Sequence, residues 1–399
     1  MASAARIALA AAGAACVALA AAGAAQAGPA AASPVPAPAN TVVRASLSQA
    51  GRSLIVSLRT TEPVALRRLP RLPRFARPRA NYLCLALRRA AGSHEKRLCL
   101  GGRTGSRRRI GLTRLRADGS TIATSTLPAT VKRPAPAKLV VTLIPGEAGL
   151  TPRRYAWRAL MATGGCGPAH ACMSRFPAAR EGTFRLRPVR AVGCTGGSAG
   201  LVRHGSRERK VVALTFDDGP SAYTSGFLSV LRRKHVNGTF FEIGQEMAGN
   251  AGLMRRILAQ GNEIGNHTMH HGFYPGYADL AATSARIERL THFRPCLFRP
   301  PGGGYNSSVV AAAGAAGMKT IIWDVDPVDW STPGSGAVYS RVVGAARPGS
   351  IILMHDGGGP RGGTLAALPA IIDTLRARGY RFATVSALLG KRMIYRPYG

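Results

Sequence analysis

The hydrophobic positions follow two different patterns along the chain. Before residue 190, short apolar runs of strand-like composition are separated by turns rich in glycine, proline and arginine, without helical periodicity. The runs cover residues 41–47, 53–58, 82–87, 138–144, 155–161 and 183–188. Short strands separated by turn residues are typical of all-β proteins. We therefore predict a β-rich, sandwich-like domain over residues 41–190.

From residue 211 onward, strand-like apolar runs alternate with helix-like stretches. The strand-like runs cover residues 211–216, 238–243, 262–264, 297–299, 320–325, 350–354 and 381–384. The helix-like stretches cover residues 225–234, 254–260, 280–290, 309–316 and 365–378. Such alternation is typical of α/β folds with parallel strands, in a barrel or a layered sheet. Residues 191–399 are thus predicted to form an α/β domain, with its chemistry at the carboxyl ends of the strands.

The first 27 residues have the pattern of a secretory signal peptide. Arg6 precedes a long apolar stretch, and residues 25–27 (Ala-Gln-Ala) provide a cleavage motif. Cleavage after Ala27 predicts a secreted protein, extracellular or associated with the cell wall, without a stable membrane span. A retained membrane anchor and a lipid anchor at Cys16 are the alternatives. Residues 28–40 are rich in alanine and proline and are predicted to form an extended linker.

Composition adds a positive charge that lies mainly in the first half. The 399 residues are 46% hydrophobic, which argues against disorder, and carry a formal net charge of +36. Residues 28–199 hold 30 Lys and Arg against 5 Asp and Glu, whereas residues 200–399 hold 23 against 13. The first half is either a solvated basic surface or a binder of an anionic cell-wall polymer, by an attraction that salt weakens. Nucleic acid is not expected as a partner, because export is predicted and no binding motif is recognised.

Six cysteines remain after the predicted cleavage, and an even number in an exported chain indicates disulfides. The order of cysteines alone does not determine their pairing. Proximity suggests the pairs Cys84–Cys99, Cys166–Cys172 and Cys194–Cys296. Zinc binding by these thiols is the competing interpretation, but the chain has no paired C-x-x-C spacing.

Candidate chemistry begins where the first strand of the second half ends. Asp217 and Asp218 follow the apolar run 211–216 and precede Gly219 and Pro220. Two adjacent acids at a strand end contribute little to packing. A plain turn is the alternative, since Asp, Gly and Pro are all turn residues.

A histidine cluster follows the run that ends at residue 264. His267 and His271 are four residues apart, so on a helical turn they would share one face and bind one metal ion. Two imidazoles and a carboxylate make a three-ligand set typical of catalytic zinc, with one position left open. His270 is the competing ligand, because His267 and His270 would also share a face.

Three more polar motifs end later strand-like runs. They are Arg299-Pro-Pro-Gly-Gly-Gly304, Asp326-Pro-Val-Asp329-Trp330 and Leu353-Met-His355-Asp356. Each motif alone could be a turn or a packed strand end. Because parallel strands present their carboxyl ends at one rim, we expect the five motifs to converge there.

The chain resembles the polysaccharide deacetylases of carbohydrate esterase family four, the NodB-like catalytic domain. The matching motifs are Thr215-Phe-Asp-Asp-Gly-Pro220, His267-Thr-x-x-His271, Arg299-x-Pro-x-Gly303, Asp326-x-x-Asp329-Trp330 and Leu353-Met-His355. Residues 238–244 also resemble the second strand of that family. The resemblance covers roughly residues 209–389 and leaves the basic first half unmatched. It implies a distorted (β/α) barrel.

The resemblance implies a metal site and a general base. Asp218, His267 and His271 would bind one divalent metal ion, usually zinc or cobalt. Asp217 would be the general base, and Arg299 would hold it in place.

The resemblance also implies a general acid and a substrate pocket. His355 would be the general acid, tuned by Asp329. Thr268 would support the loop that carries the two histidines. Trp330 and Leu353 would line the pocket for the acetyl methyl group.

Gly302 departs from the family pattern, which usually has Tyr or Phe at this position. The family implies that the backbone N–H at this position helps to stabilise an oxyanion, a role that glycine can keep. The missing ring leaves the shape of the pocket, and with it the substrate preference, open.

The implied function is a secreted, metal-dependent deacetylase. It would remove N-acetyl groups from a glycan such as cell-wall peptidoglycan or chitin-like oligomers and release acetate. An O-acetyl esterase acting on xylan is an alternative with the same fold, because ester and amide hydrolysis need the same groups. A catalytically silent wall-binding protein is a further alternative, and the ionisable residues kept in all five motifs argue against it.

Overall fold

A computed structural model describes most of the chain. The described residues are 40–64, 82–89, 95–100, 109–115, 121–162, 173–195 and 199–398. The predicted signal peptide and nearly all of the predicted linker lie outside them, as do Cys166 and Cys172. No helix within the described ranges is long and apolar enough to cross a membrane. The described elements form a β-rich region (residues 42–186) and a barrel region (residues 189–397).

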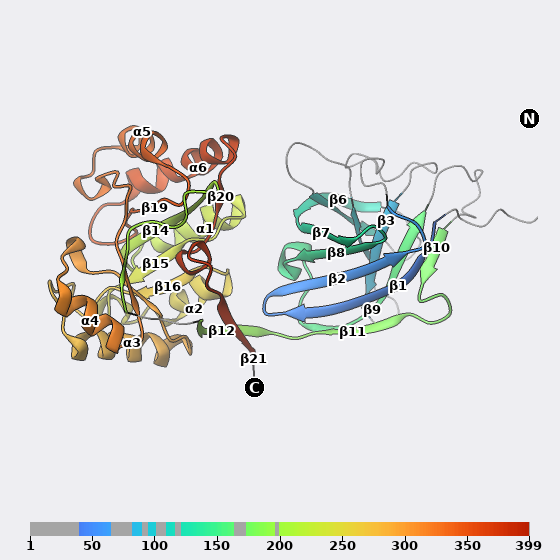
Figure 1. Cartoon of the computed structure of the whole chain (residues 1–399), viewed down its shortest axis with the longest axis horizontal. Helices are drawn as coiled ribbons and strands as arrows, with labels where there is room; N and C mark the ends of the chain where they lie inside the picture. Colours follow the sequence, from blue (N-terminus) through green and yellow to red (C-terminus); the bar gives the residue numbers. More distant parts are fainter. Residues whose placement is uncertain are drawn as a thin grey trace, which may run out of the picture. The chain divides into compact units, whose positions relative to one another are not determined.

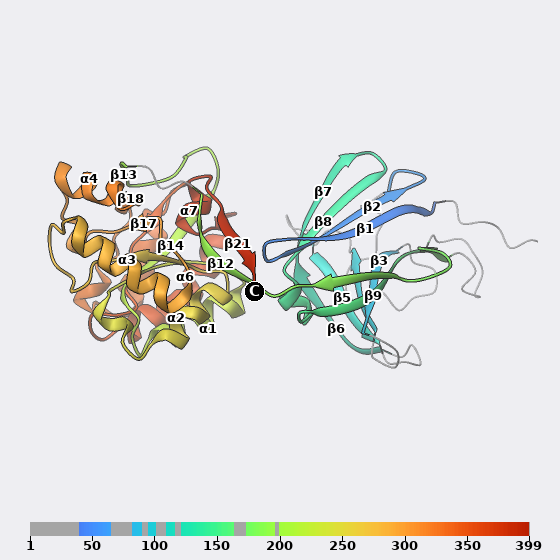
Figure 2. The same cartoon turned by 90° about the horizontal axis from the view of Figure 1, so that it is seen from below.

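Two antiparallel sheets build the β-rich region (Figures 1 and 2). The strand order is β1-β2-β8-β7 in the first sheet and β10-β9-β3-β4-β5-β6 in the second, where β11 also pairs with β9. The first sheet consists of β1 (Val42–Ala50), β2 (Ser53–Thr60), β7 (Thr130–Ala135) and β8 (Lys138–Leu143), followed by the 3-10 helix η2 (Pro145–Ala148). The second consists of β3 (Tyr82–Arg88), β4 (Glu95–Leu100), β5 (Arg109–Leu115), β6 (Thr121–Pro128), β9 (Arg153–Ala162), β10 (Met173–Phe176) and β11 (Gly182–Leu186).

The two sheets of the β-rich region share one hydrophobic core. On β2, Leu54 and Val56 are buried while the residues between them are only partly covered, because successive side chains of a strand point to opposite faces. Leu83 and Leu85 of β3 join the same core from the other sheet. The prediction of a β-rich, sandwich-like fold is therefore confirmed.

Two disulfides lie within the described residues. Cys84 and Cys99 are directly opposite each other on β3 and β4, and their sulfurs are bonded. Cys194, the last residue of β12 (Val189–Cys194), is bonded to Cys296. β12 pairs with β21 (Met393–Pro397), so this bond joins a two-stranded ribbon to the segment before β17.

A parallel sheet forms the centre of the barrel region (Figure 1). Its order is β13-β18-β17-β16-β15-β14-β19, with β20 also pairing with β14, and the strands of this sheet pair in parallel. The strands are β13 (Leu201–Val202), β14 (Val211–Gly219), β15 (Thr239–Glu242), β16 (Glu263–Asn266), β17 (Leu297–Phe298), β18 (Lys319–Ile321), β19 (Ile351–Ile352) and β20 (Arg381–Phe382). The predicted distorted (β/α) barrel is confirmed.

Helices between the strands bury the outer face of this sheet. They are α1 (Thr224–Lys234), α2 (Ala251–Ala259), α3 (Tyr277–Thr291), α4 (Ser307–Ala315), α5 (Ser335–Ala345), α6 (Gly362–Ala377) and α7 (Val385–Leu388), with the 3-10 turns η3 (Gln245–Met247), η4 (Pro301–Gly303) and η5 (Asp329–Ser331). Leu214 and Phe216 of β14 pack with Phe227 and Leu231 of α1 and Ile371 of α6 in one core. Because all the strands are parallel, their carboxyl ends meet at one rim.

Several strands are shorter than the sequence predicts. The run expected over residues 320–325 is a strand only over Lys319–Ile321, and the run expected over 350–354 only over Ile351–Ile352. Leu353 and Met354 leave the ladder while still buried and lead to His355, whereas the segment from β18 to Asp329 alternates between buried and exposed residues.

Candidate active site

The carboxyl ends of the parallel strands bring together most of the residues singled out from the sequence. Asp217 and Asp218 lie near the end of β14, and His267 directly follows β16. Arg299 follows β17, and His355 comes three residues after β19. The backbone of Asp217 also forms a parallel bridge with that of His355. The predicted convergence therefore places carboxylates, imidazoles and a guanidinium from four strand ends at one rim.

Asp218, His267 and His271 form a cluster whose ligand atoms all lie within 4.8 Å of one another. Oδ1 of Asp218 is 3.3 Å from Nε2 of His267 and 3.2 Å from Nε2 of His271. It is buried, yet no hydrogen bond to it is found among the described residues. Nδ1 of His267 lies 2.7 Å from the carbonyl oxygen of Arg299.

This arrangement fits a divalent metal ion. Because a carbonyl oxygen only accepts hydrogen bonds, Nδ1 of His267 carries the proton and Nε2 presents its lone pair. That lone pair faces a carboxylate oxygen of Asp218, which also carries lone pairs, and a cation between them satisfies both. Two imidazole nitrogens and one carboxylate oxygen are the donor set of catalytic zinc sites.

The segment from His267 to His271 is not the helical turn that the i,i+4 spacing predicts. Thr268 and His271 have positive φ angles of 69° and 57°, and such residues reverse the chain within a loop. The loop is held where the N–H of Thr268 donates to Oδ1 of Asn266 at 2.9 Å. Nδ1 of His270 instead lies 3.0 Å from Oε1 of Gln245. The loop thus groups His271, and not His270, with His267 and Asp218.

Asp217 is held by a fully buried arginine. Nη1 of Arg299 donates to Oδ1 of Asp217 at 2.7 Å and to Oγ1 of Thr215 at 2.7 Å. The guanidinium carbon lies 4.2 Å from the centre of the Phe241 ring, a cation–π distance. Burial lowers the pKa of Arg299, although the charge of Asp217 opposes this, and the residue stays a cation at neutral pH. Oδ2 of Asp217 makes no such contact and lies 3.9 Å from Nε2 of His267, so it faces the cluster.

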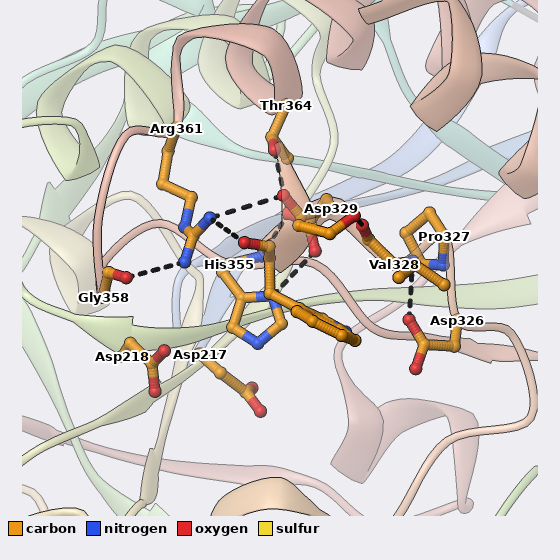
Figure 3. Close-up of polar contacts among 12 residues, drawn as sticks. Asp217, Asp218, Asp326, Pro327, Val328, Asp329, His355, Gly358, Arg361 and Thr364 are labelled. Atoms are coloured by element: carbon orange, nitrogen blue, oxygen red, sulfur yellow. Dashed lines mark hydrogen bonds and ion pairs between the residues drawn. The ribbon is translucent and has the colours of Figure 1, made fainter. Parts of the chain in front are cut away.

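His355 is paired with a buried carboxylate (Figure 3). Oδ1 of Asp329 is 2.7 Å from Nδ1 of the His355 ring, and Oδ2 of Asp329 accepts a hydrogen bond from the backbone N–H of His355 at 3.0 Å. Oγ1 of Thr364 donates to the same Oδ2 at 2.8 Å, so both oxygens of Asp329 are fixed. In Figure 3 the other ring nitrogen of His355 faces the side on which Asp217 and Asp218 lie. Burial lowers the pKa of His355, but the hydrogen bond and charge of Asp329 outweigh it, and the pKa is raised above its usual value.

The three residues expected at the substrate pocket lie near this centre in different settings. Leu353 is buried and follows β19. Trp330 lies next to Asp329 in η5 and is 57% exposed. Gly302 is the middle residue of η4 and has a φ angle of 59°, which favours glycine.

Arg361 was not foreseen from the sequence, and the structure gives it a central place (Figure 3). It is 3% exposed, and its guanidinium donates to the carbonyl oxygens of Gly357 at 2.6 Å and Gly358 at 2.9 Å. It also reaches the carbonyl oxygen of Asp329 at 3.4 Å. A Cβ added at Gly358 would lie 2.3 Å from Oδ2 of Asp218, so only glycine lets this loop approach the carboxylate. Arg361 thus joins the loop behind Asp218 to the loop that carries Asp329.

Two further buried acids lie behind Asp217. Glu242 and Asp356 are both 0% exposed, and a Cβ added at Gly219 would come within 2.9 Å of both carboxylates. Burial, with the nearby charges of Asp356 and Asp217, raises the pKa of Glu242 well above its usual range. Burial also raises the pKa of Asp356 to about 7, although Oγ1 of Thr224 donates a hydrogen bond to it. The sequence pattern predicted Glu242 only as part of a buried strand, and its carboxylate has no hydrogen-bond partner among the described residues.

Glu242→Gln is expected to reduce the loss of folding stability that occurs as pH rises. Because the pKa of Glu242 is higher in the folded than in the unfolded protein, the stability that this group contributes is fully present below about pH 4 and is lost as pH rises. The amide removes this decline, and the melting temperature of the variant should exceed that of the wild type near pH 8 but not near pH 5. Thermal unfolding at constant metal concentration measures both curves.

Glu246→Gln is the matched control, because Glu246 is an exposed acid four residues away. Its curve should run parallel to that of the wild type. Equal pH slopes for Glu242→Gln and the wild type would contradict a neutral, buried Glu242.

The barrel region is similar in sequence to known proteins. Residues 204–321 match the sequence model of the polysaccharide deacetylase family. A peptidoglycan-N-acetylglucosamine deacetylase from Bacillus cereus is 42% identical over 188 residues, which cover 45% of this chain and 88% of that protein. A chitooligosaccharide deacetylase from a Bradyrhizobium species is 37% identical over 191 residues, covering 42% of this chain and 86% of that protein. A crystal structure of a peptidoglycan N-acetylglucosamine deacetylase is 30% identical, with a TM-score of 0.47, and covers 48% of this chain and 94% of that one.

The chain therefore belongs to the polysaccharide deacetylases of carbohydrate esterase family four. It is a hydrolase of the glycan deacetylase class. The matched part of the chain lies in the barrel region, which contains the cluster of Asp218, His267 and His271.

Proposed function

We propose that this protein hydrolyses N-acetyl groups on a glycan, with a divalent metal ion, and releases acetate. The observation that carries the proposal is that the two adjacent acids at the rim, Asp217 and Asp218, have different partners. Asp218 faces His267 and His271, whereas Asp217 is held by Arg299 with one oxygen free. On the same rim, His355 is held by Asp329. A metal site, a base and an acid are the three parts that amide hydrolysis needs.

The metal would be held by Asp218, His267 and His271. When bound, a divalent ion lowers the pKa of water and polarises a carbonyl group. Zinc suits two imidazoles and one carboxylate, and cobalt accepts the same nitrogen and oxygen donors.

The protein's own groups then carry the protons. Oδ2 of Asp217 accepts a proton from the attacking water, while Arg299 fixes the other oxygen. The N–H of Gly302 is available to the oxyanion that develops on the acetyl carbonyl. His355 donates a proton to the amide nitrogen, because an amine leaves only after protonation. Asp329 supports this step by keeping the imidazole of His355 protonated and correctly turned.

Peptidoglycan is the substrate that we favour, with chitin-like oligomers next. Two curated relatives of this chain, from Bacillus cereus and Listeria monocytogenes, are peptidoglycan-N-acetylglucosamine deacetylases. Export through the predicted signal peptide would bring the protein to the cell wall, and the basic first half would favour an anionic wall polymer. The oxidising compartment beyond the membrane also suits the two disulfides.

Acetate release from peptidoglycan, N-acetylglucosamine oligomers and acetylxylan, compared side by side with zinc-loaded protein, tests the proposal. We expect release from one or both N-acetylated substrates and little from acetylxylan. Release from acetylxylan alone would make the protein an O-acetyl esterase. Release from none of the three would favour a silent wall-binding protein.

Asp329→Asn is expected to shift the alkaline limb of the pH profile of kcat/KM to lower pH. The charge of Asp329 raises the pKa of His355, so the neutral amide lets His355 lose its proton at a lower pH. Activity then declines earlier as pH rises, and the pH profile on an N-acetylglucosamine oligomer measures the shift. Asp373→Asn, at an exposed acid on α6, is the control and should leave the profile in place. An unmoved alkaline limb in Asp329→Asn would assign the proton donor to another group.

A further inference from the structure

Two neighbouring aromatic side chains beside the candidate metal site are exposed. Phe273 is 65% exposed and Tyr274 is 60% exposed. They come directly after the loop that carries His271, and Tyr274 itself has a positive φ angle of 52°. Neither ring belongs to the hydrophobic core of the barrel region, so core packing does not explain why they are held there. Large exposed aromatic surface at the edge of a site is typical of ligand contact.

The ring of Phe273 lies over the turn that contains Gly302. A Cβ added at Gly302 would be 2.8 Å from Cε1 of Phe273, so this ring occupies the space that a side chain at position 302 would enter. A Cβ added at Gly304 would be 3.5 Å from Phe273 and 3.7 Å from Tyr274. The glycines of the turn thus leave room for aromatic rings that come from a different loop.

The same ring borders the candidate metal site. The centres of the His271 and Phe273 rings are 6.4 Å apart, at an interplanar angle of 65°. Phe273 therefore stands between a candidate metal ligand and the turn whose N–H faces the developing oxyanion in the proposed mechanism. Phe273 is thus positioned to contact the sugar ring of a substrate whose acetyl group reaches that centre.

We propose that Phe273 and Tyr274 form an aromatic platform for a pyranose ring of the glycan, so that these two residues determine specificity. A pyranose with equatorial hydroxyls presents C–H groups on its faces, and these groups pack against the negative face of an aromatic ring. The platform rests on the proposed function, because its occupant is the sugar chain whose acetyl group is removed. It selects glycans over small acetyl esters without taking part in bond making or breaking.

The test compares kcat/KM for an N-acetylglucosamine pentamer with kcat/KM for 4-nitrophenyl acetate, using zinc-loaded, full-length protein. In Phe273→Ala, kcat/KM for the pentamer divided by kcat/KM for the ester should fall about tenfold, because KM for the pentamer rises. Phe273→Trp should keep the ratio, whereas Phe273→Leu, which retains apolar bulk without a ring, should lose it. Tyr398→Ala is the control, since Tyr398 is 54% exposed and follows the ribbon strand β21.

Calorimetric binding of the same pentamer gives a readout that does not depend on turnover. Phe273→Ala should bind it about tenfold more weakly than the wild type. An unchanged ratio together with unchanged binding would overturn the platform. An equal fall in both kcat/KM values would also overturn it, because Phe273 would then only support the His271 loop. Wild-type protein that binds the pentamer but hydrolyses neither compound would refute the proposed function and leave the binding comparison to decide the platform.

Discussion

Asp217→Asn is expected to lower kcat on an N-acetylglucosamine oligomer by about a thousandfold while the metal stays bound. The amide keeps the shape of the carboxylate and a contact to Arg299, but it cannot accept a proton from water. Asp217 lies outside the cluster of potential ligand atoms, with its Oδ2 3.9 Å from Nε2 of His267. Turnover and zinc content, measured on the same preparation, test both halves of the expectation.

Asp218→Asn is the matched variant, one residue away. Oδ1 of Asp218 faces both Nε2 atoms of the histidine pair, so its amide should lose metal as well as turnover. Equal metal loss in the two variants would contradict the assignment of Asp217 as base and Asp218 as ligand.

Removal of the metal is expected to abolish turnover, and added zinc or cobalt should restore it. The cluster of Asp218, His267 and His271 is the site that we expect to be emptied. His271→Ala removes one of three ligands and should weaken zinc binding by about a hundredfold or more. The measurement is metal titration of the chelator-treated protein, followed by recovery of acetate release.

His270→Ala is the control for this series, because Nδ1 of His270 lies against Gln245 instead of facing Asp218. It should keep most of the zinc affinity. A larger loss of zinc affinity in His270→Ala than in His271→Ala would make His270 the ligand in place of His271. Full turnover in metal-free protein would refute the metal site.

The positions of the strands along the chain and their meeting at one rim could be predicted because hydrophobic runs and their ends are local properties. Two acids follow the run 211–216, and β14 contains both of them and ends at Gly219. The runs before His267 and Arg299 are buried strands as well. Parallel pairing then brings these separate strand ends together without any further information.

The loop geometry could not be predicted from periodicity. The spacing of His267 and His271 suits a helix, but two residues with positive φ bring the imidazoles together in a loop. Spacing alone therefore left His270 and His271 both open as partners of His267 and predicted the wrong backbone for this segment. The choice against His270 depends on Gln245, which is 25 residues away in sequence.

Contacts between distant segments explain the remaining omissions. Arg361 lies in a segment of glycines with one proline that carries no recognised motif, yet its guanidinium binds carbonyls of two loops. Phe273 lies beside Gly302 only because two loops from different strand ends meet. Neither relation leaves a periodic signal in the sequence.

N-deacetylation releases one acetate and exposes one primary amine for each bond that is hydrolysed. Zinc-loaded protein is incubated with an N-acetylglucosamine pentamer, and released acetate and newly formed primary amine are quantified together over time. N-deacetylation predicts that both products rise in equal amounts, and that neither rises with Asp217→Asn. Acetate released without a matching amine, or no acetate from either the pentamer or peptidoglycan, would contradict the assignment of this protein as a glycan N-deacetylase.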